Sequence, residues 1–256
     1  MSMQNFKSLF FLPLICISIL SIADNYPSRI LFVGNSYLYY NDSIHNHVEK
    51  MLIEHYGDEK ITTKSATIGG SRLYNHNIDH LLEPKNLQLD EQIDLLIMQG
   101  GSGEVLTEDS RKKFEDTAYI YSTKAHDQGV KTALYMTHAY TKDDRRYKKN
   151  LIDRIRKTYY PAAKKSNSDI IPVGEAYEIA YQKRPDIKLH HPDGTHPGML
   201  GTYLGAATVF AVITKKSPEG LKYNYLNRVS SEDKIFLQQV AWEAYLQSKE
   251  IIKGDN

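Results

Sequence analysis

Cysteine is almost absent from this chain of 256 residues. The single cysteine is Cys16, which lies in the first 23 residues. Without that segment the chain has no thiol, so disulfides and cysteine chemistry are excluded and stability must come from the hydrophobic core. A chain of this length can bury a core of sufficient size in one α/β domain.

An excess of charge of either sign is also lacking. Lys and Arg number 32 and Asp and Glu 31, which gives a formal net charge of +1. Nucleic-acid binding needs a clustered basic surface, and the chain has one basic run, Arg145-Arg146-Tyr147-Lys148-Lys149. That run lies in a helical pattern, which favours a solvated helix face, with an acidic partner or an anionic glycan as the alternative. No nucleic-acid partner is expected.

Charged residues are scarce at the N-terminus. Lys7 precedes the apolar residues 8–20, and Ser21-Ile22-Ala23 places small residues where a signal peptidase needs them. The pattern predicts a signal peptide over residues 1–23, cleaved after Ala23, and hence a periplasmic or secreted protein. The run is short for a membrane span, although an uncleaved anchor is an alternative. The residues before Cys16 are too bulky for a lipoprotein site.

The remaining chain, residues 24–256, alternates short apolar runs with longer amphipathic stretches and has no internal repeat. Strands are expected at Arg29–Val33, Lys60–Ala66, Asp94–Gln99, Lys131–Met136 and Asp169–Val173. Helices are expected at Ser43–Tyr56, Thr107–Gln128, Asp143–Lys165, Glu175–Gln182, Met199–Thr214 and Ser231–Ile252. In the last helix the expected buried stripe is Ile235, Leu237, Val240, Ala241, Tyr245 and Leu246. The alternation predicts a single α/β/α domain in three layers around a five-stranded, mostly parallel sheet.

A candidate nucleophile directly follows the first expected strand. The segment Ile30-Leu31-Phe32-Val33-Gly34-Asn35-Ser36 is an apolar run that ends in a glycine and a hydroxyl residue. At a strand-to-helix junction the Ser36 hydroxyl can stand above the sheet, and the Ser36 N–H can stabilise developing negative charge. Taken alone, Ser36 would be interpreted as the cap of the next helix.

A carboxylate and an imidazole lie three residues apart near the other end of the chain, in Asp193-Gly194-Thr195-His196-Pro197. In a tight turn Asp193 and His196 can face one cavity, where the carboxylate orients the imidazole. The structural alternative is a surface turn, because Asp, Gly and Pro favour turns. Together with Ser36, the two residues complete a nucleophile, a base and a group that orients the base.

These segments resemble the SGNH (GDSL-like) hydrolase family over most of the mature chain. In that family the nucleophilic serine lies in a first block, here Gly34-Asn35-Ser36-Tyr37, and the last block is Asp-x-x-His, here Asp193 to His196. A second-block glycine adds its N–H to the oxyanion hole beside the N–H of the serine. Ile68-Gly69-Gly70-Ser71 matches that block, with Gly70 as the favoured donor and Gly69 as the alternative. The resemblance implies the flavodoxin-like SGNH fold, a Ser-His-Asp triad, and no metal or organic cofactor.

The third block departs from the family pattern. It is usually Gly-x-Asn-Asp, whose Asn is a side-chain oxyanion donor, whereas this chain has Gln99-Gly100-Gly101-Ser102. Aligning the glycines puts Ser102 in place of the Asn, but Gln99 is the nearest side-chain amide. The resemblance to carbohydrate-active relatives favours Gln99 as the third donor, with Ser102 as the alternative. A missing donor would cost about two to three orders of magnitude in rate.

The resemblance and the residues near the triad indicate an ester substrate. We expect a serine esterase that removes acyl groups, acetyl in particular, from a small molecule or a glycan. Tyrosines after the nucleophile suit sugar faces or acyl chains, with packing of an amphipathic segment as the alternative. Substrate contacts are expected from Asn35, Tyr37, Ser102 and His138, the last of which follows the fourth strand. For His138 a structural role is the alternative. Arg72, Tyr74 and Glu104 are further candidates whose alternative is a surface role.

Three other functions stay open at this stage. A lipid-directed esterase or lysophospholipase is an alternative, although no long apolar lid is evident. A non-catalytic glycan-binding protein on the same scaffold is another. A metal-dependent phosphoesterase would use His190 and His191 with Asp193 and His196, but prolines interrupt the segment and no matching Asp/His cluster lies upstream. No metal site is therefore expected.

Overall fold

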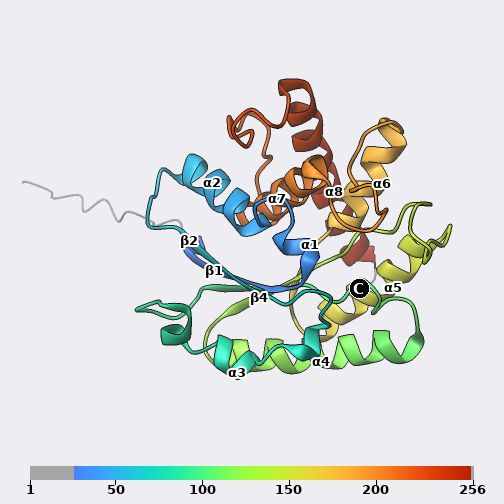
Figure 1. The fold of residues 1–256 in the computed structure, drawn as a ribbon. Coiled ribbons are helices and arrows are strands. Elements are labelled where there is room, and N and C mark those ends of the chain that lie inside the picture. The colour runs from blue at the N-terminus through green and yellow to red at the C-terminus, as the bar shows by residue number, and fades with distance from the viewer. Residues whose placement is uncertain (1–25, 255–256) are drawn as a thin grey trace, which may run out of the picture.

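The computed structural model describes residues 26–254. They form five strands and the helices that cover them (Figure 1). The signal peptide predicted for residues 1–23 lies outside the described residues. Within them, no helix combines the length and the apolar character that crossing a membrane requires.

The centre of the fold is a sheet whose five strands all run parallel, as expected. The strands lie in the order β2-β1-β3-β4-β5. In this register Phe32 of β1 pairs with Ser65 of β2 on one side and with Ile97 of β3 on the other. The strand bounds are β1 (Arg29–Gly34), β2 (Thr62–Thr67), β3 (Leu95–Met98), β4 (Lys131–Tyr135) and β5 (Asp169–Ile171).

Helices cover both faces of the sheet and complete the three layers (Figure 1). One layer holds α2 (Ile44–Tyr56), α6 (Val173–Lys183), α7 (Met199–Thr214) and α8 (Ser231–Gly254). The other holds α3 (Ile78–Leu81), α4 (Glu108–His126) and α5 (Leu151–Lys165). Shorter helical turns that the sequence did not indicate are α1 (Ser36–Tyr39), η1 (Leu73–Asn75) and η2 (Pro84–Leu87).

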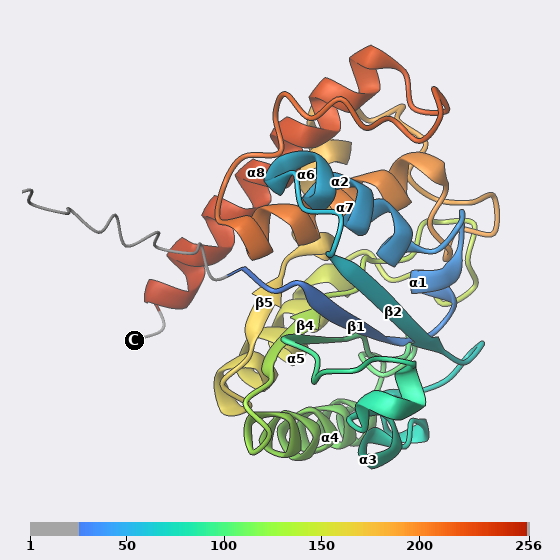
Figure 2. The same ribbon diagram turned by 90° about the vertical axis from the view of Figure 1, so that its left-hand side faces the viewer.

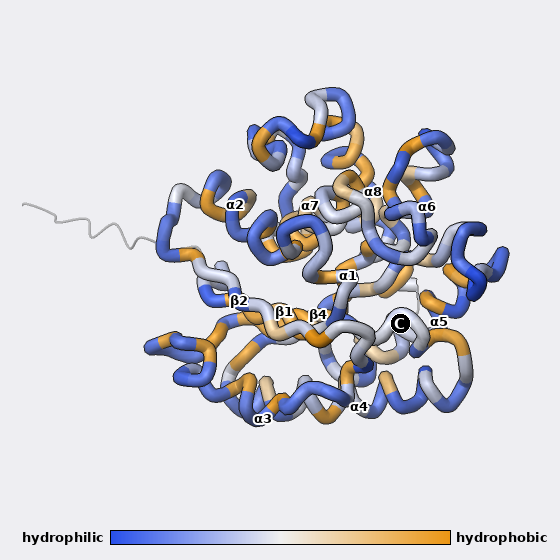
Figure 3. The backbone as a smooth tube through the Cα atoms, viewed as in Figure 1, coloured by the Kyte–Doolittle hydropathy of each residue, from blue (hydrophilic) through white to orange (hydrophobic). Residues whose placement is uncertain are grey.

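The strands place alternate side chains into two separate cores. In β1, Ile30 and Phe32 join the core under α2 and α7, whereas Leu31 and Val33 join the core above α4 and α5. Successive side chains of a strand point to opposite faces, so a strand covered on both sides must be apolar throughout. Figure 3 shows apolar residues along β1 and β4 between the two layers of helices, whereas the edge strand β2 is more polar.

Two expectations about helices are wrong in detail. The helix expected from Asp143 begins only at Leu151, because the Asp144 carboxylate accepts the N–H of Arg146 and holds a turn there. In α8, Ile235 and Leu246 are exposed, at 52% and 47%, although the other four residues of the expected stripe are buried.

Candidate active site

Four chain segments meet beyond the carboxyl ends of the strands, where parallel sheets bind their ligands. They are α1 after β1, the loop after β2, the loop after β4, and the turn that precedes α7. In Figure 2 the strands run toward α1, away from the edge at which β1 begins. The candidate residues therefore gather at one edge of the sheet, as the sequence predicted.

Ser36 is the first residue of α1 and is held there by its neighbour Asn35. The Asn35 side chain accepts a hydrogen bond from the N–H of Tyr37 at 3.1 Å and so caps the helix. Its amide nitrogen donates to the carbonyl oxygens of Ser71 at 3.0 Å and Gly100 at 3.4 Å. One buried side chain thus joins the loops after three strands beside the candidate nucleophile.

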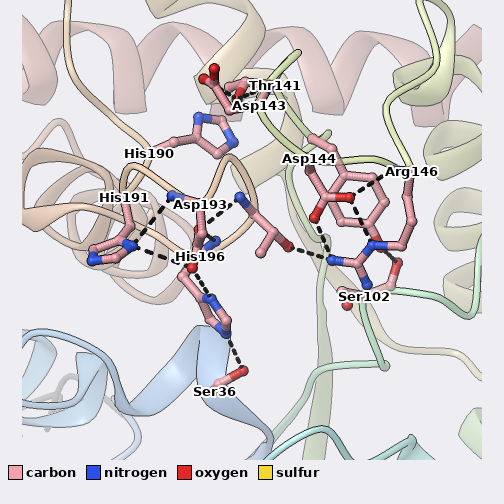
Figure 4. A network of polar contacts seen from close by, with 12 residues as sticks. Ser36, Ser102, Thr141, Asp143, Asp144, Arg146, His190, His191, Asp193 and His196 are labelled. Carbon is pink, nitrogen blue, oxygen red and sulfur yellow. Dashed lines mark hydrogen bonds and ion pairs between the residues drawn. The ribbon is translucent and has the colours of Figure 1, made fainter.

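Ser36, His196 and Asp193 form a continuous line of hydrogen bonds (Figure 4). The His196 Nε2 lies 2.9 Å from the Ser36 Oγ, and its Nδ1 lies 2.7 Å from the Asp193 Oδ2. A carboxylate only accepts hydrogen bonds, so the proton of the neutral ring is on Nδ1 and Nε2 is free to accept from the serine. This is the arrangement in which a histidine can act as a general base.

The protein stabilises Asp193 as an anion. Burial opposes ionisation, but the N–H of Thr195 and the side chain and N–H of His196 outweigh it, so the pKa of Asp193 lies well below its usual range. Both N–H groups donate to the Asp193 Oδ1 at 3.0 Å, which leaves Oδ2 for the imidazole. A permanent negative charge beside Nδ1 favours the imidazolium that general-base catalysis produces.

Two tyrosines that follow Ser36 hold the ring of His196. Tyr40 stacks on the imidazole with 4.2 Å between ring centroids and 5° between planes. Tyr37 meets the same ring edge-on at 5.9 Å. The side chains of Asp193 and His196 remain 36% and 23% exposed, so the triad opens to solvent.

The loop after β2 lies where an oxyanion donor is expected. The N–H of Ile68 donates to the carbonyl oxygen of Gly34 at 3.1 Å, and the hydroxyl of Ser71 reaches the same oxygen at 3.3 Å. These bonds hold Gly69 and Gly70 beside the turn that carries Ser36. Both glycines are exposed, so their N–H groups can meet a substrate.

The structure corrects the role expected for Gln99. This side chain is fully buried, and backbone groups engage both ends of its amide. Its oxygen accepts from the N–H of Asn35 at 3.0 Å, and its nitrogen donates to the carbonyl oxygen of Gly100. Gln99 therefore ties the end of β3 to the turn before α1, and it does not face the solvent from which an ester would approach.

The structure also corrects the expected substrate contacts, because three of the four residues lie in the protein interior. Asn35, Tyr37 and His138 are each 3% exposed. The ring of His138 lies between those of Tyr37 and Tyr177, at 4.5 Å and 4.3 Å. Ser102 is half-buried, and its carbonyl oxygen accepts from the Tyr140 hydroxyl at 2.6 Å. Ser102 alone of the four keeps access to substrate.

The remaining sequence candidates lie beside the third block. Glu104 is buried and accepts from the N–H of Gly101. Arg72 is half-buried, and its guanidinium lies next to Gly103. The ring of Tyr74 is covered by the ammonium of Lys113 at 3.5 Å.

The histidines before the turn that carries Asp193 and His196 have partners within the protein. His190 meets the carbonyl oxygen of Ala139 at 2.9 Å through Nε2 and the Tyr181 hydroxyl at 2.6 Å through Nδ1. His191 is exposed, with its Nδ1 3.3 Å from the Asp193 Oδ2. Among residues 26–254, no three His, Cys, Asp or Glu side chains gather in a way that could hold a metal ion.

Sequence reasoning did not assign a role to Thr195, Arg146 or Tyr140. Arg146 was interpreted as part of a solvated helix, yet it donates to the Thr195 hydroxyl at 3.2 Å and lies over the ring of Tyr140 at 4.3 Å. In the sequence, the one sign of a role for Thr195 is its position between Asp193 and His196. For Arg146 the signal was Asp144, a residue that favours turns, two positions earlier.

Comparisons with known proteins find similarity in structure alone. No family model matches the chain, and no curated protein matches it. A DUF4886 family protein from Bacteroides uniformis is similar with a TM-score of 0.67 and 20% identity, over 85% of this chain and 94% of that protein.

Two other solved structures cover the same domain. A candidate SGNH hydrolase from Slackia heliotrinireducens has a TM-score of 0.56 and 24% identity, over 72% of this chain and 97% of its own. An acetyl xylan esterase has a TM-score of 0.58 and 18% identity, over 72% and 99%. With its five parallel strands, the chain therefore has the fold of the SGNH (GDSL-like) hydrolases.

Proposed function

We propose that this protein is a serine esterase that removes acyl groups, acetyl in particular, from carbohydrate. The observation that carries the proposal is the line from the Ser36 Oγ through both nitrogens of His196 to the Asp193 carboxylate. Similar structures include one named an acetyl xylan esterase, which supports ester hydrolysis as the general activity of this fold.

In the proposed reaction His196 moves one proton in each half. Its Nε2 takes the proton of Ser36 as the Oγ attacks the ester carbonyl carbon, and Asp193 stabilises the imidazolium. The N–H groups of Ser36 and Gly70 hold the oxyanion, with the Ser102 hydroxyl as the remaining candidate for a third donor. His196 then protonates the leaving alcohol, and water releases the acyl group from Ser36 by the reverse steps.

The exposure of the triad favours a large polar alcohol over a long acyl chain. The partly exposed side chains of Asp193 and His196, with the exposed residues Tyr39 and Ile68, leave the triad open at the surface. A glycan can present a small acetyl group to such a site, and the tyrosine rings offer faces for sugars. A lipase needs instead a deep apolar space for its acyl chain.

Export is a separate part of the proposal. The signal-peptide pattern of residues 1–23 would deliver the protein to the periplasm or the medium, where polymeric glycans lie. The mature enzyme would begin at Asp24. Such a location suits an enzyme whose substrate is too large to enter the cell.

The test is hydrolysis of p-nitrophenyl acetate, butyrate and octanoate and of acetylated xylan by residues 24–256. We expect activity that is highest with acetate, and a loss of about four to six orders of magnitude in kcat for Ser36→Ala or His196→Ala. The control is His80→Ala, which changes an exposed histidine on α3. Circular dichroism shows whether each variant is folded.

Four results would contradict the proposal. Activity retained in folded Ser36→Ala would remove the serine mechanism. Activity lost on addition of EDTA would favour a metal-dependent phosphoesterase. Octanoate as the best substrate would favour a lipid esterase, whereas an inactive parent that binds acetylated xylan would be a glycan-binding protein.

A further inference from the structure

Thr195, between the two catalytic residues of the last block, has every polar group engaged. Its N–H donates to the Asp193 Oδ1 at 3.0 Å, and its carbonyl oxygen lies 2.7 Å from the His138 Nε2. Its hydroxyl lies 2.7 Å from the Tyr37 hydroxyl and accepts from Arg146 at 3.2 Å. A surface turn would leave most of these groups to water, so this turn is held from several sides.

The side chain of Arg146 is held by residues other than Thr195. Its guanidinium forms two hydrogen bonds with the Asp144 carboxylate, at 2.9 and 2.6 Å (Figure 4). The guanidinium also lies over the ring of Tyr140. The guanidinium can only donate, so the Thr195 hydroxyl must accept from it. Arg146 therefore contributes a hydrogen bond to the turn, because its charge is already paired with Asp144.

His138 contacts the same turn from the protein interior. Burial and the nearby His190 keep the pKa of His138 well below its usual value, so the ring is neutral. Because its Nε2 meets a carbonyl oxygen, the proton of the ring lies on that nitrogen. Stacking between Tyr37 and Tyr177 fixes the plane of the ring. His138 therefore donates to Thr195 from a rigid position.

The loop after β4 contacts the backbone of the turn as well. The N–H of Thr141 donates to the carbonyl oxygen of Gly194 at 2.9 Å. Gly194 has φ +72°, and a Cβ there would lie 2.6 Å from the Thr141 Oγ1 and 2.7 Å from the Asp144 nitrogen. The loop and the turn are thus in contact at both Gly194 and Thr195, too close for a larger residue at position 194.

We propose that Thr195 is the positioning residue of this site. Its hydroxyl, held by Tyr37 and Arg146, fixes the turn so that Asp193 and His196 stay aligned with Ser36. Arg146 and His138 act through Thr195. The inference rests on the proposed esterase function, because it assigns to Thr195 a role in the same triad.

The test compares Thr195→Val, which keeps the shape but removes the hydroxyl, with Thr195→Ser, which keeps the hydroxyl. We expect Thr195→Val to lower kcat by about 10- to 100-fold, with KM within about twofold, because a misplacement of about 1 Å costs that much. Thr195→Ser should retain kcat within about threefold. A matched pair of variants each removes one positive charge. Arg146→Met should lower kcat, whereas Arg145→Met, at an exposed neighbouring position, should not.

A second readout does not depend on turnover. The proton between the His196 Nδ1 and Asp193 should give a downfield NMR signal in the parent and in Thr195→Ser, but a broadened or absent signal in Thr195→Val and Arg146→Met. Unchanged kcat and an unchanged signal in folded Thr195→Val would overturn the inference. So would an equal loss in Thr195→Ser, or an equal effect of Arg145→Met. If Thr195→Val does not fold, Arg146→Met decides.

The two proposals fail in different ways. If the parent protein hydrolyses none of the substrates, the proposed function is refuted. The NMR signal then still tests whether Thr195 holds the turn. An active parent whose Thr195→Val variant is equally active and keeps its signal refutes only the positioning role.

Discussion

Glu104 shows how burial changes the chemistry of a single residue. Burial raises the pKa of this carboxyl to about 7, although the N–H of Gly101 and the charge of Arg72 act in the opposite direction. One carboxyl oxygen accepts from Gly101, and the other has no partner among the described residues. An ionised carboxylate is costly in such a place.

We therefore predict that Glu104→Gln stabilises the protein at alkaline pH. The folded state holds the Glu104 proton more tightly than the unfolded state does, so native stability falls as pH rises from about 4.5 to about 7. The amide removes that dependence. At pH 8 the variant should gain about 1–3 kcal/mol in the free energy of unfolding, and at pH 4 it should gain almost nothing.

Urea unfolding at the two pH values measures the difference. The control is Glu59→Gln, an exposed glutamate, which should change stability at neither pH. An equal gain at pH 4 and pH 8 would mean that the stabilisation has another origin than the titration of Glu104.

At the scale of elements, the junction of β1 and α1 requires close packing. The Gln99 side chain crosses from β3 to the N–H of Asn35 and passes directly over Gly34. A Cβ at position 34 would lie 2.6 Å from the Gln99 Oε1 and 2.7 Å from the Leu38 Cδ1. Only glycine fits there, because the neighbouring side chains are buried and cannot retreat.

Gly34→Ala should consequently destabilise the protein by about 1–3 kcal/mol through overpacking. It should also lower kcat, because Asn35 and Ser36 follow directly. Thermal unfolding and p-nitrophenyl acetate hydrolysis measure the two effects. The matched control is Gly103→Ala, whose Cβ would meet nothing nearer than 3.5 Å. Equal stability of the two variants would show that the junction can relax.

At the scale of the whole molecule, the parallel sheet brings together residues that are far apart in sequence. Ser36 and His196 are 160 positions apart, and they meet because β1 ends at the edge where the turn before α7 lies. The helix α7 begins at Met199, just after that turn, and runs into the core against α2, α6 and α8. The turn that carries Asp193 and His196 is thus followed directly by a helix most of whose residues are buried.

We predict that residues 1–23 direct the export of this protein. Expressed from Met1 in a bacterial host, the protein should be exported and should lose residues 1–23, so that its mass corresponds to an N-terminal Asp24. Mass spectrometry of the periplasmic and membrane fractions measures this. Replacing Ala23 with Arg should block the cut. A full-length product held in the membrane would instead indicate an uncleaved anchor.

Much of the fold followed from local patterns in the sequence. Aliphatic and β-branched runs located the five strands. The apolar stretch Met199–Thr214 matches α7 at both ends, because burial on all sides leaves a signal in a single segment. The sequence by itself also indicated Ser36, Asp193 and His196, since short motifs carry those residue types in a set order.

Only the tertiary structure decided what supports these three residues. Gln99 turns inward to Asn35, 64 positions away, and Thr195 meets Tyr37 158 positions away. The turn at Asp144 replaces the expected helix start and brings Arg146 to the hydroxyl of Thr195. Such contacts have no local pattern, because they depend on which loops the sheet places at its edge and on which polar groups find partners there.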